Sequence, residues 1–297
     1  MAATRILEEH GLKAKKGLGQ HFLVDRGILL RIVESADLDE RDTVLEIGAG
    51  TGTLTAHLAQ RARQVIAVEV DEEMLGPLRQ SVSGCDNVRV VHGDILQQDL
   101  AALTERKPYK VVANLPYYIT SAVLRYLLEP ECRPSVLVVT VQRQVAERIV
   151  GRLVRHGGHA RPGLLRMSLL AVSVQFYGLP RIVARIPAGA FRPVPAVDSA
   201  VVRVDVYDPL PWGAVDHKVF FRAARAGFAQ SRKQLHNALA HNLRLPAEQV
   251  WGACEGAGVD ARRRAETLSI QEWVALSAAL GPLLAGPDGR RGREVER

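Results

Sequence analysis

Along the chain, short apolar runs alternate with longer segments in which apolar positions recur at helical spacing. The runs at 43–47, 64–70, 88–92, 110–113 and 136–141 predict buried strands. Helical spacing predicts helices at 28–36, 52–61, 74–81, 121–128, 142–154 and 164–176. Because strands that alternate with helices form a parallel sheet covered on both faces, we expect an α/β fold.

Two further apolar runs, at 182–186 and 201–206, are joined by a proline-rich connection without a helix. Such a pair predicts an antiparallel hairpin at the sheet edge, giving seven strands in all. Beyond residues 208–211 (Asp-Pro-Leu-Pro) only helical patterns remain, at 219–228, 232–241, 247–253 and 270–280. We therefore expect a basic N-terminal arm over 1–20, an α/β domain over 21–208, a small all-α C-terminal domain over 209–284 and a disordered tail over 285–297.

Composition narrows the class of protein. The 297 residues are 47% hydrophobic, which is enough to bury a sizeable core. We find no apolar run of the roughly 20 residues that a membrane span needs, and no secretory signal. Three widely spaced cysteines, Cys85, Cys132 and Cys254, fit neither a disulfide framework nor a zinc site. We expect a cytoplasmic protein without a bound metal, and nothing in the sequence demands more than a monomer.

Charge is divided unevenly between the two halves of the chain. Residues 1–150 hold 18 basic and 20 acidic side chains, a net charge of −2, whereas residues 151–297 hold 21 and 12, a net charge of +9. A basic surface attracts nucleic-acid phosphates, although it also occurs on proteins that are merely soluble. Arg232 and Lys233, at the start of a predicted helix, are candidate RNA contacts, and a solvated helix end is the alternative.

A glycine loop and two acids follow successive predicted strands. Gly48, Gly50 and Gly52 join the first strand to a helix, although their spacing differs from that of dinucleotide-binding loops. Glu69 ends the second strand, where an acid can hold ribose hydroxyls, and Asp94 follows the third, where it can accept from an adenine amino group. Because the carboxyl ends of parallel strands form the ligand crevice, their joint placement predicts a cofactor site.

The sequence Asn114, Leu115, Pro116 and Tyr117 ends the fourth strand and faces the same crevice. An aromatic amine is a poor nucleophile because its lone pair is delocalised. Acceptors at the Asn114 side chain and the Leu115 carbonyl can draw its N–H groups toward tetrahedral geometry, and Tyr117 can stack on a flipped base. Phe191, between the last two strands, is a candidate second face for that base, and a buried loop aromatic is the alternative.

With these motifs placed, residues 12–281 closely resemble the ribosomal RNA adenine dimethyltransferases, most strongly the bacterial KsgA-type family that acts on 16S rRNA. The resemblance rests on the motifs above together with the stretches 18–23 (Leu-Gly-Gln-His-Phe-Leu), 191–199 (Phe-Arg-Pro-Val-Pro-Ala-Val-Asp-Ser) and 232–237 (Arg-Lys-Gln-Leu-His-Asn). One departure lies at 167–171 (Met-Ser-Leu-Leu-Ala), where the family usually shows Tyr-Gly-x-Leu-Ser. Helix packing or RNA contacts near residues 157–171 can therefore differ from the family's.

The resemblance implies a Rossmann-like class I methyltransferase sheet with S-adenosyl-L-methionine as methyl donor. It implies N6,N6-dimethylation of two adjacent adenosines in the 3′-terminal hairpin of small-subunit rRNA, late in assembly of that subunit. It assigns the cofactor to His21, Leu23, Gly48, Glu69, Asp94 and Asn114, catalysis to residues 114–117, and the facing aromatic to Phe191.

Three alternatives remain open from the sequence. The first is a macrolide-resistance-type methyltransferase acting on large-subunit rRNA, although Leu115 and the stretch 191–199 favour the small-subunit enzyme. The second is a non-catalytic RNA-binding assembly or transcription factor, which the intact motifs disfavour. A small-molecule or DNA adenine methyltransferase is more distant, because the basic helical appendage argues against it.

Overall fold

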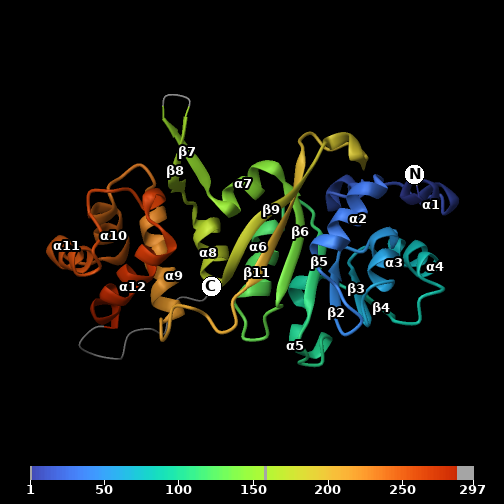
Figure 1. Ribbon diagram of the computed structural model, residues 1–297, viewed down its shortest axis with the longest axis horizontal. Helices are drawn as coiled ribbons and strands as arrows, with labels where there is room; N and C mark the ends of the chain where they lie inside the picture. The colour runs from blue at the N-terminus through green and yellow to red at the C-terminus, as the bar shows by residue number, and fades with distance from the viewer. Residues whose placement is uncertain (1, 157–158, 286–297) are drawn as a thin grey trace. The chain divides into compact units, whose positions relative to one another are not determined.

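A computed structural model describes residues 2–156 and 159–285 (Figure 1). Two compact units divide the chain: unit 1 holds residues 1–150 and 177–208, and unit 2 holds 151–176 and 209–297. The chain thus passes into unit 2 at the predicted boundary near 208, but residues 151–176, which the sequence placed in the α/β domain, cluster with unit 2. The predicted tail over 285–297 lies outside the described residues, apart from Ala285.

A seven-stranded sheet forms the centre of unit 1, with the strand order β4-β3-β2-β5-β6-β11-β9 (Figure 1). Its strands are β2 (Thr43–Ile47), β3 (Gln64–Glu69), β4 (Val88–His92), β5 (Lys110–Asn114), β6 (Val136–Gln142), β9 (Gly178–Ile186) and β11 (Ser199–Val206). Pairing is parallel from β4 to β6, whereas β11 runs antiparallel to both β6 and β9. The structure therefore confirms the mostly parallel sheet with an antiparallel edge hairpin.

Helices of unit 1 bury their apolar faces against this sheet. They are α2 (Arg26–Ser35), α3 (Thr53–Ala59), α4 (Leu75–Ser81), α5 (Leu100–Leu103), α6 (Thr120–Leu128) and α7 (Arg143–Val150). One hydrophobic cluster joins α2 and α3 to β2, β3 and the edge hairpin, and α4 packs on β3 through Leu78 and Ala67. Strand β2 is buried along its whole length, as a strand covered on both faces of a parallel sheet should be, and Thr43 and Glu46 are its two polar residues.

The predicted N-terminal arm contains structure that periodicity did not reveal. Helix α1 (Ala2–Glu9) packs through Leu7 against Phe22 and Met74. Strand β1 (Phe22–Leu23) pairs antiparallel with β10 (Phe191–Arg192). This small ladder fixes residues 18–23 beside the sheet, so part of the arm belongs to the wall of unit 1.

The predicted helices at 142–154 and 164–176 are wrong where they approach each other. Helix α7 ends at Val150, because Gly151 adopts a φ of +86° that terminates a right-handed helix. The chain then forms an antiparallel pair, β7 (Arg152–His156) and β8 (His159–Arg166). Helix α8 (Leu169–Tyr177) starts only after Ser168, whose hydroxyl accepts a hydrogen bond from the Ala171 amide.

Four helices make up the rest of the described part of unit 2: α9 (His217–Phe228), α10 (Leu235–Leu243), α11 (Ala247–Gly256) and α12 (Ile270–Ala285). Trp273 is fully buried among them and stacks on Phe228 at 5.6 Å between ring centroids. A Cβ on Gly227 would lie 2.5 Å from the Trp273 ring, so only glycine allows α9 and α12 to approach this closely. Among the described residues, no helix is long and apolar enough to cross a membrane.

Candidate active site

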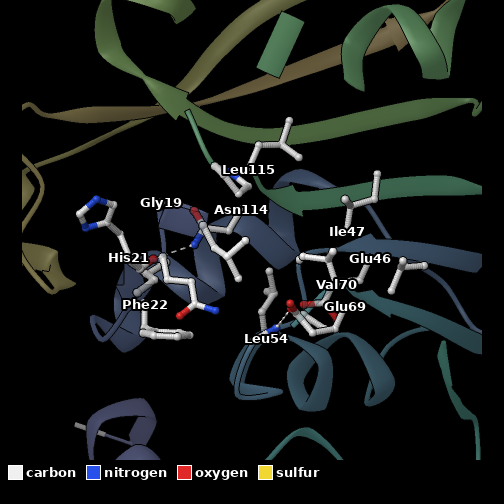
Figure 2. Close-up of a pocket in the computed structure, with 18 of the residues that line it drawn as sticks. Gly19, His21, Phe22, Glu46, Ile47, Leu54, Glu69, Val70, Asn114 and Leu115 are labelled. Atoms are coloured by element: carbon white, nitrogen blue, oxygen red, sulfur yellow. Dashed lines mark hydrogen bonds between the residues drawn. The ribbon is translucent and has the colours of Figure 1, made fainter. Parts of the chain in front are cut away.

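A cavity of unit 1 opens at the carboxyl ends of β2, β3 and β5, with residues 18–23 as a further wall (Figure 2). Of the residues singled out from the sequence, it is lined by His21, Leu23, Gly48, Gly50, Glu69, Asp94, Asn114, Leu115, Pro116 and Tyr117. Gly52, Phe191, Arg232 and Lys233 are not among its lining residues. The strand-end rule therefore brings most of the candidate residues together.

The loop after β2 contains three glycines, at positions 48, 50 and 52, and all three adopt positive φ angles. Gly50, at a φ of +55°, lies under the Phe22 ring, where an added Cβ would be 3.1 Å from Phe22 Cε1. Gly52, at a φ of +77°, is the residue before α3, and an added Cβ would be 2.9 Å from Leu78 Cδ1. The absence of a side chain at Gly50 therefore lets the Phe22 ring lie against the loop, and its absence at Gly52 lets α3 pack against α4.

Glu69 anchors that loop from the end of β3. One carboxylate oxygen accepts from the Gly50 amide at 2.7 Å (Figure 2). The other accepts from the Asp71 amide at 2.8 Å. Burial raises the pKa of Glu69, and these two backbone hydrogen bonds offset part of that rise. Each oxygen keeps a lone pair, so the carboxylate can still accept from the hydroxyls of a bound ribose.

Glu46 is a cavity residue whose role the sequence analysis missed. Its side chain on β2 is 1% exposed, and Oε2 has no hydrogen-bond partner among the described residues. Burial raises the pKa of Glu46 to about 8; the Thr55 hydroxyl lowers it only partly, and the Glu69 charge adds to the rise. A buried carboxyl with an unmet oxygen is suited to a cationic or hydrogen-bond-donating ligand. The acid two positions before the first glycine was the signal in the sequence.

Asp94 lies at the edge of the cavity after β4. Its Oδ1 caps a short helical turn by accepting from the Leu96 amide at 3.0 Å. One oxygen of Asp94 is therefore engaged as a helix cap. Its position in the cavity wall still allows the carboxylate to accept from a ligand amine.

An ionic contact holds residues 15–20 against the end of β3. The Asp71 carboxylate accepts from Lys15 Nζ at 2.8 Å and from Gln20 Nε2 at 2.7 Å. Burial opposes ionisation of Asp71, but the hydrogen bonds from Lys15, Gln20 and the Glu73 amide outweigh it and hold its pKa below the ordinary value. The sequence analysis placed Lys15 in a basic arm, and no local pattern linked it to Asp71.

Asn114 ends β5 with its amide group oriented by the backbone of residue 21. Its Nδ2 donates to the His21 carbonyl oxygen at 3.1 Å (Figure 2). Because the NH₂ end is engaged there, Oδ1 is the end left to accept from a substrate amine. The fold thus selects the orientation of Asn114 that the proposed chemistry requires.

Tyr117 is half-buried and held on two sides. Its hydroxyl exchanges a 2.8 Å hydrogen bond with Ser199 Oγ, and its ring stacks on His21 at 5.8 Å between centroids and 20° between planes. The His21 Nδ1–H in turn donates to the Pro193 carbonyl at 2.7 Å. Residues 21, 117, 193 and 199 therefore form one connected group at the cavity mouth.

Phe191 is not a face of this cavity. Its side chain is 1% exposed and belongs to the core cluster that contains Leu23 and the buried residues of α2 and α3. Strand β10 turns the ring inward when it pairs with β1. In this structure the Phe191 ring is buried, as the alternative expects, and His21 is the ring beside Tyr117. The base-stacking role of Phe191 stays a prediction.

Arg232 and Lys233 lie in unit 2, and both side chains are exposed. The predicted helix at 232–241 starts later than expected, because α10 begins at Leu235. The two cations therefore lie in the turn before α10. Their role as RNA contacts stays a prediction.

The residues present fit S-adenosyl-L-methionine. Acceptor oxygens at Glu69 and Asp94 suit its ribose and adenine, and the unmet Glu46 oxygen suits its cationic amino-acid end. In the described part of the chain, no group of three or more His, Cys, Asp or Glu side chains could hold a metal ion.

Comparison with known proteins gives a consistent family. The model of the family "Ribosomal RNA adenine dimethylase" matches residues 11–280. Ribosomal RNA small subunit methyltransferase A of Dehalococcoides mccartyi is 46% identical, over 92% of this chain and 91% of that protein. The protein of the same name from Geobacillus thermodenitrificans is 40% identical, over 94% of each chain.

Solved structures agree on the fold. The 23S rRNA methyltransferase ErmE superposes with a TM-score of 0.67 at 28% identity, over 88% of this chain and 99% of ErmE. A dimethyladenosine transferase from Plasmodium falciparum superposes with a TM-score of 0.71 at 22% identity, over 88% of this chain and 98% of that one. The seven-stranded sheet is therefore that of the class I methyltransferases.

Proposed function

This chain belongs to the ribosomal RNA adenine dimethylase family, and on that premise we propose that it dimethylates N6 of two adjacent adenosines in the 3′-terminal hairpin of small-subunit rRNA. The orientation of Asn114 carries the proposal. Its Nδ2 is held by the His21 carbonyl, in the same cavity as the glycine loop and Glu69, so Oδ1 is available to a substrate amine.

S-adenosyl-L-methionine supplies an electrophilic methyl group on a sulfonium. Glu69 and Asp94 would hold its ribose and adenine, and Glu46 would hold its amino-acid end. Asn114 Oδ1 and the Leu115 carbonyl accept the two N6 protons of the adenine. These hydrogen bonds would favour a tetrahedral amine, whose lone pair is then available to react with an electrophile. Tyr117, fixed by Ser199, provides a face for the flipped base.

We further propose that the substrate is the rRNA of an assembling small subunit in the cytoplasm and that the enzyme acts as a monomer. Support for the small subunit comes from the 46% and 40% identity to proteins named for it, against 28% to the large-subunit enzyme ErmE. The predicted RNA-binding role of unit 2 is part of this proposal, supported by its 17 basic and 9 acidic side chains, a net charge of +8.

A methyl-transfer assay tests the proposal. Labelled S-adenosyl-L-methionine is offered to unmethylated small and large subunits, and the modified nucleosides are mapped by mass spectrometry. We expect N6,N6-dimethyladenosine in the 3′-terminal hairpin of small-subunit rRNA. Label confined to large-subunit rRNA would support the resistance-type alternative, and cofactor binding without transfer would support a non-catalytic factor.

The Asn114→Ala variant tests the assigned chemistry. It should remain folded by circular dichroism and lose methyl transfer by about 10²-fold or more, as when a donor or acceptor that stabilises a transition state is removed. Near-normal turnover by the folded variant would contradict the role of Asn114.

A further inference from the structure

Three exposed apolar side chains of unit 1 belong to segments that border the cavity. Tyr118 is the most exposed large hydrophobic residue in the described part of the chain, at 66%, and it directly follows the catalytic residues 114–117. Val194 and Val197 are 55% and 39% exposed and lie on the loop that follows β10. We call these three residues the apolar rim. Exposed apolar groups that border a concave site mark a binding surface.

Tyr118 has a fixed place beside the cavity. An added Cβ on Gly19 would lie 3.4 Å from Tyr118 Cε1 and 3.6 Å from Pro116 Cβ, so the ring lies along the Gly19 backbone. Gly19 and Pro116 both line the cavity. The aromatic ring therefore has one edge supported by the cavity wall, while most of its surface is open to solvent.

The valines of the apolar rim are tied to the same mouth. The Pro193 carbonyl, next to Val194, accepts the hydrogen bond from His21, and Ser199, two residues after Val197, holds the Tyr117 hydroxyl. Tyr117 and Tyr118 are consecutive but differ in burial, since Tyr117 is half-buried in the cavity and Tyr118 is exposed at its edge. One ring is placed for a base inside, and the next for a group just outside.

We propose that Tyr118 stacks on the nucleobase adjacent to the adenosine that enters the cavity. This inference rests on the proposed function. A flipped base leaves its neighbour without a stacking partner on one face, and an exposed tyrosine ring can replace that partner. In the proposed substrate the neighbour is itself the second target adenine, a purine with a large stacking surface. Tyr118 is thus a positioning residue for the substrate strand.

Because Tyr118 lies at one edge of the cavity mouth, its ring cannot stack equally well on the neighbour of each target adenosine. When the first adenosine of the pair enters, its partner lies on the 3′ side, and when the second enters, its partner lies on the 5′ side. Tyr118 can support only one of these arrangements fully. Loss of the ring should therefore slow dimethylation at one adenosine more than at the other.

The experiment compares Tyr118→Ala, Tyr118→Phe and Leu179→Ala on unmethylated small subunits. Leu179 is the matched control, because it is 56% exposed on β9 and does not line the cavity. We expect Tyr118→Ala to raise KM for the subunit about tenfold or more, the effect of one lost base–aromatic stack, with kcat changed less and cofactor binding unchanged. Tyr118→Phe and Leu179→Ala should stay within about twofold of the wild type.

Mass spectrometry measures dimethylation at each adenosine separately. A purely structural role of Tyr118 would lower dimethylation equally at both. Unequal loss of dimethylation at the two positions in Tyr118→Ala supports stacking on the neighbour. A KM within about twofold of the wild type, or an equal loss at both adenosines, overturns it. If the wild type itself leaves small-subunit rRNA unmodified, the proposed function fails, and that outcome is distinct from a failure of the Tyr118 proposal.

A coupling measurement isolates the contact. Subunits are reconstituted with uridine in place of one of the two adenosines, and transfer to the remaining adenosine is measured with both enzymes. If Tyr118 stacks on the neighbouring base, the smaller pyrimidine should impair the wild type but add little to the defect of Tyr118→Ala. Equal additional losses in both enzymes contradict the contact.

Discussion

Replacing Glu46 with Gln should flatten the pH dependence of stability in the cofactor-free protein. Burial raises the pKa of this carboxyl from an ordinary value of 4.5 to about 8. Between these two values the folded protein keeps a proton that the unfolded chain releases. The free energy of unfolding of the wild type therefore falls as the pH rises through this window.

The size of the effect follows from the shift. Each pH unit inside the window is worth about 1.4 kcal/mol, so Glu46 removes roughly 3 kcal/mol between pH 4.5 and 7 and at most roughly 5 kcal/mol above pH 8. A glutamine side chain does not ionise and lacks this dependence. A buried amide has unmet hydrogen bonds of its own, but their cost is the same at every pH. The test therefore compares how the free energy of unfolding changes with pH in the two proteins, and not their difference at a single pH.

Urea unfolding at pH 5, 6, 7 and 8 provides the measurement. Far-UV circular dichroism is the suitable probe, because all three tryptophans, at 212, 251 and 273, belong to unit 2 and would not report on unit 1. The stability advantage of Glu46→Gln should grow by roughly 2–3 kcal/mol between pH 5 and 7. An exposed carboxyl replaced in the same way, Glu40→Gln, should follow the wild type. Parallel profiles for the wild type and Glu46→Gln would refute the buried neutral carboxyl.

Three further predictions concern the residues around the cavity. Phe191→Ala should lower stability by about 3–5 kcal/mol in chemical denaturation, whereas Phe191→Leu should keep methyl transfer; a stable Leu variant without activity would support the base-stacking role. Gly52→Ala should lower the free energy of unfolding by about 1–3 kcal/mol in thermal unfolding, because the positive φ of Gly52 and its close neighbours both disfavour a side chain. The control Gly76→Ala should be neutral or stabilising, because an added Cβ there would have no atom within 4 Å. Lys15→Ala should weaken cofactor binding about two- to fivefold in calorimetry. Because folding lowers the pKa of Asp71, the contact between Lys15 and Asp71 stabilises the folded protein above the ordinary Asp pKa of 3.8, and this stabilisation is lost as the pH falls. An unchanged cofactor affinity in Lys15→Ala would contradict the role of this contact.

Much of the sheet could be predicted because its central strands are buried on both faces. Strands β2, β5 and β6 are mostly apolar in sequence and buried along most of their length. The rule that ligands bind at carboxyl ends then predicted a site at Glu69, Asp94 and Asn114. The prediction needed no knowledge of distant contacts, because each residue follows its own strand directly.

Elements without a local period could not be predicted in this way. Strands β1 and β10 have two residues each, too few for any repeat, and they are recognised only when paired. That pairing decides whether Phe191 lies in the core or in the cavity, so its burial was equally inaccessible. Residues 152–156, Arg-Leu-Val-Arg-His, do not distinguish a strand from a helix end, and Gly151 was the available sign of a break.

The β1–β10 ladder also explains how distant segments cooperate at the acceptor site. His21 immediately precedes β1, and it contacts Asn114 through its carbonyl, Pro193 through Nδ1 and Tyr117 through its ring. Pro193 lies 172 positions along the chain but immediately follows β10. Removal of the His21 ring would release two of these contacts but leave the carbonyl in place. The orientation of Asn114 therefore depends on where the ladder holds the backbone at residue 21, which makes this short pairing part of the geometry proposed for catalysis.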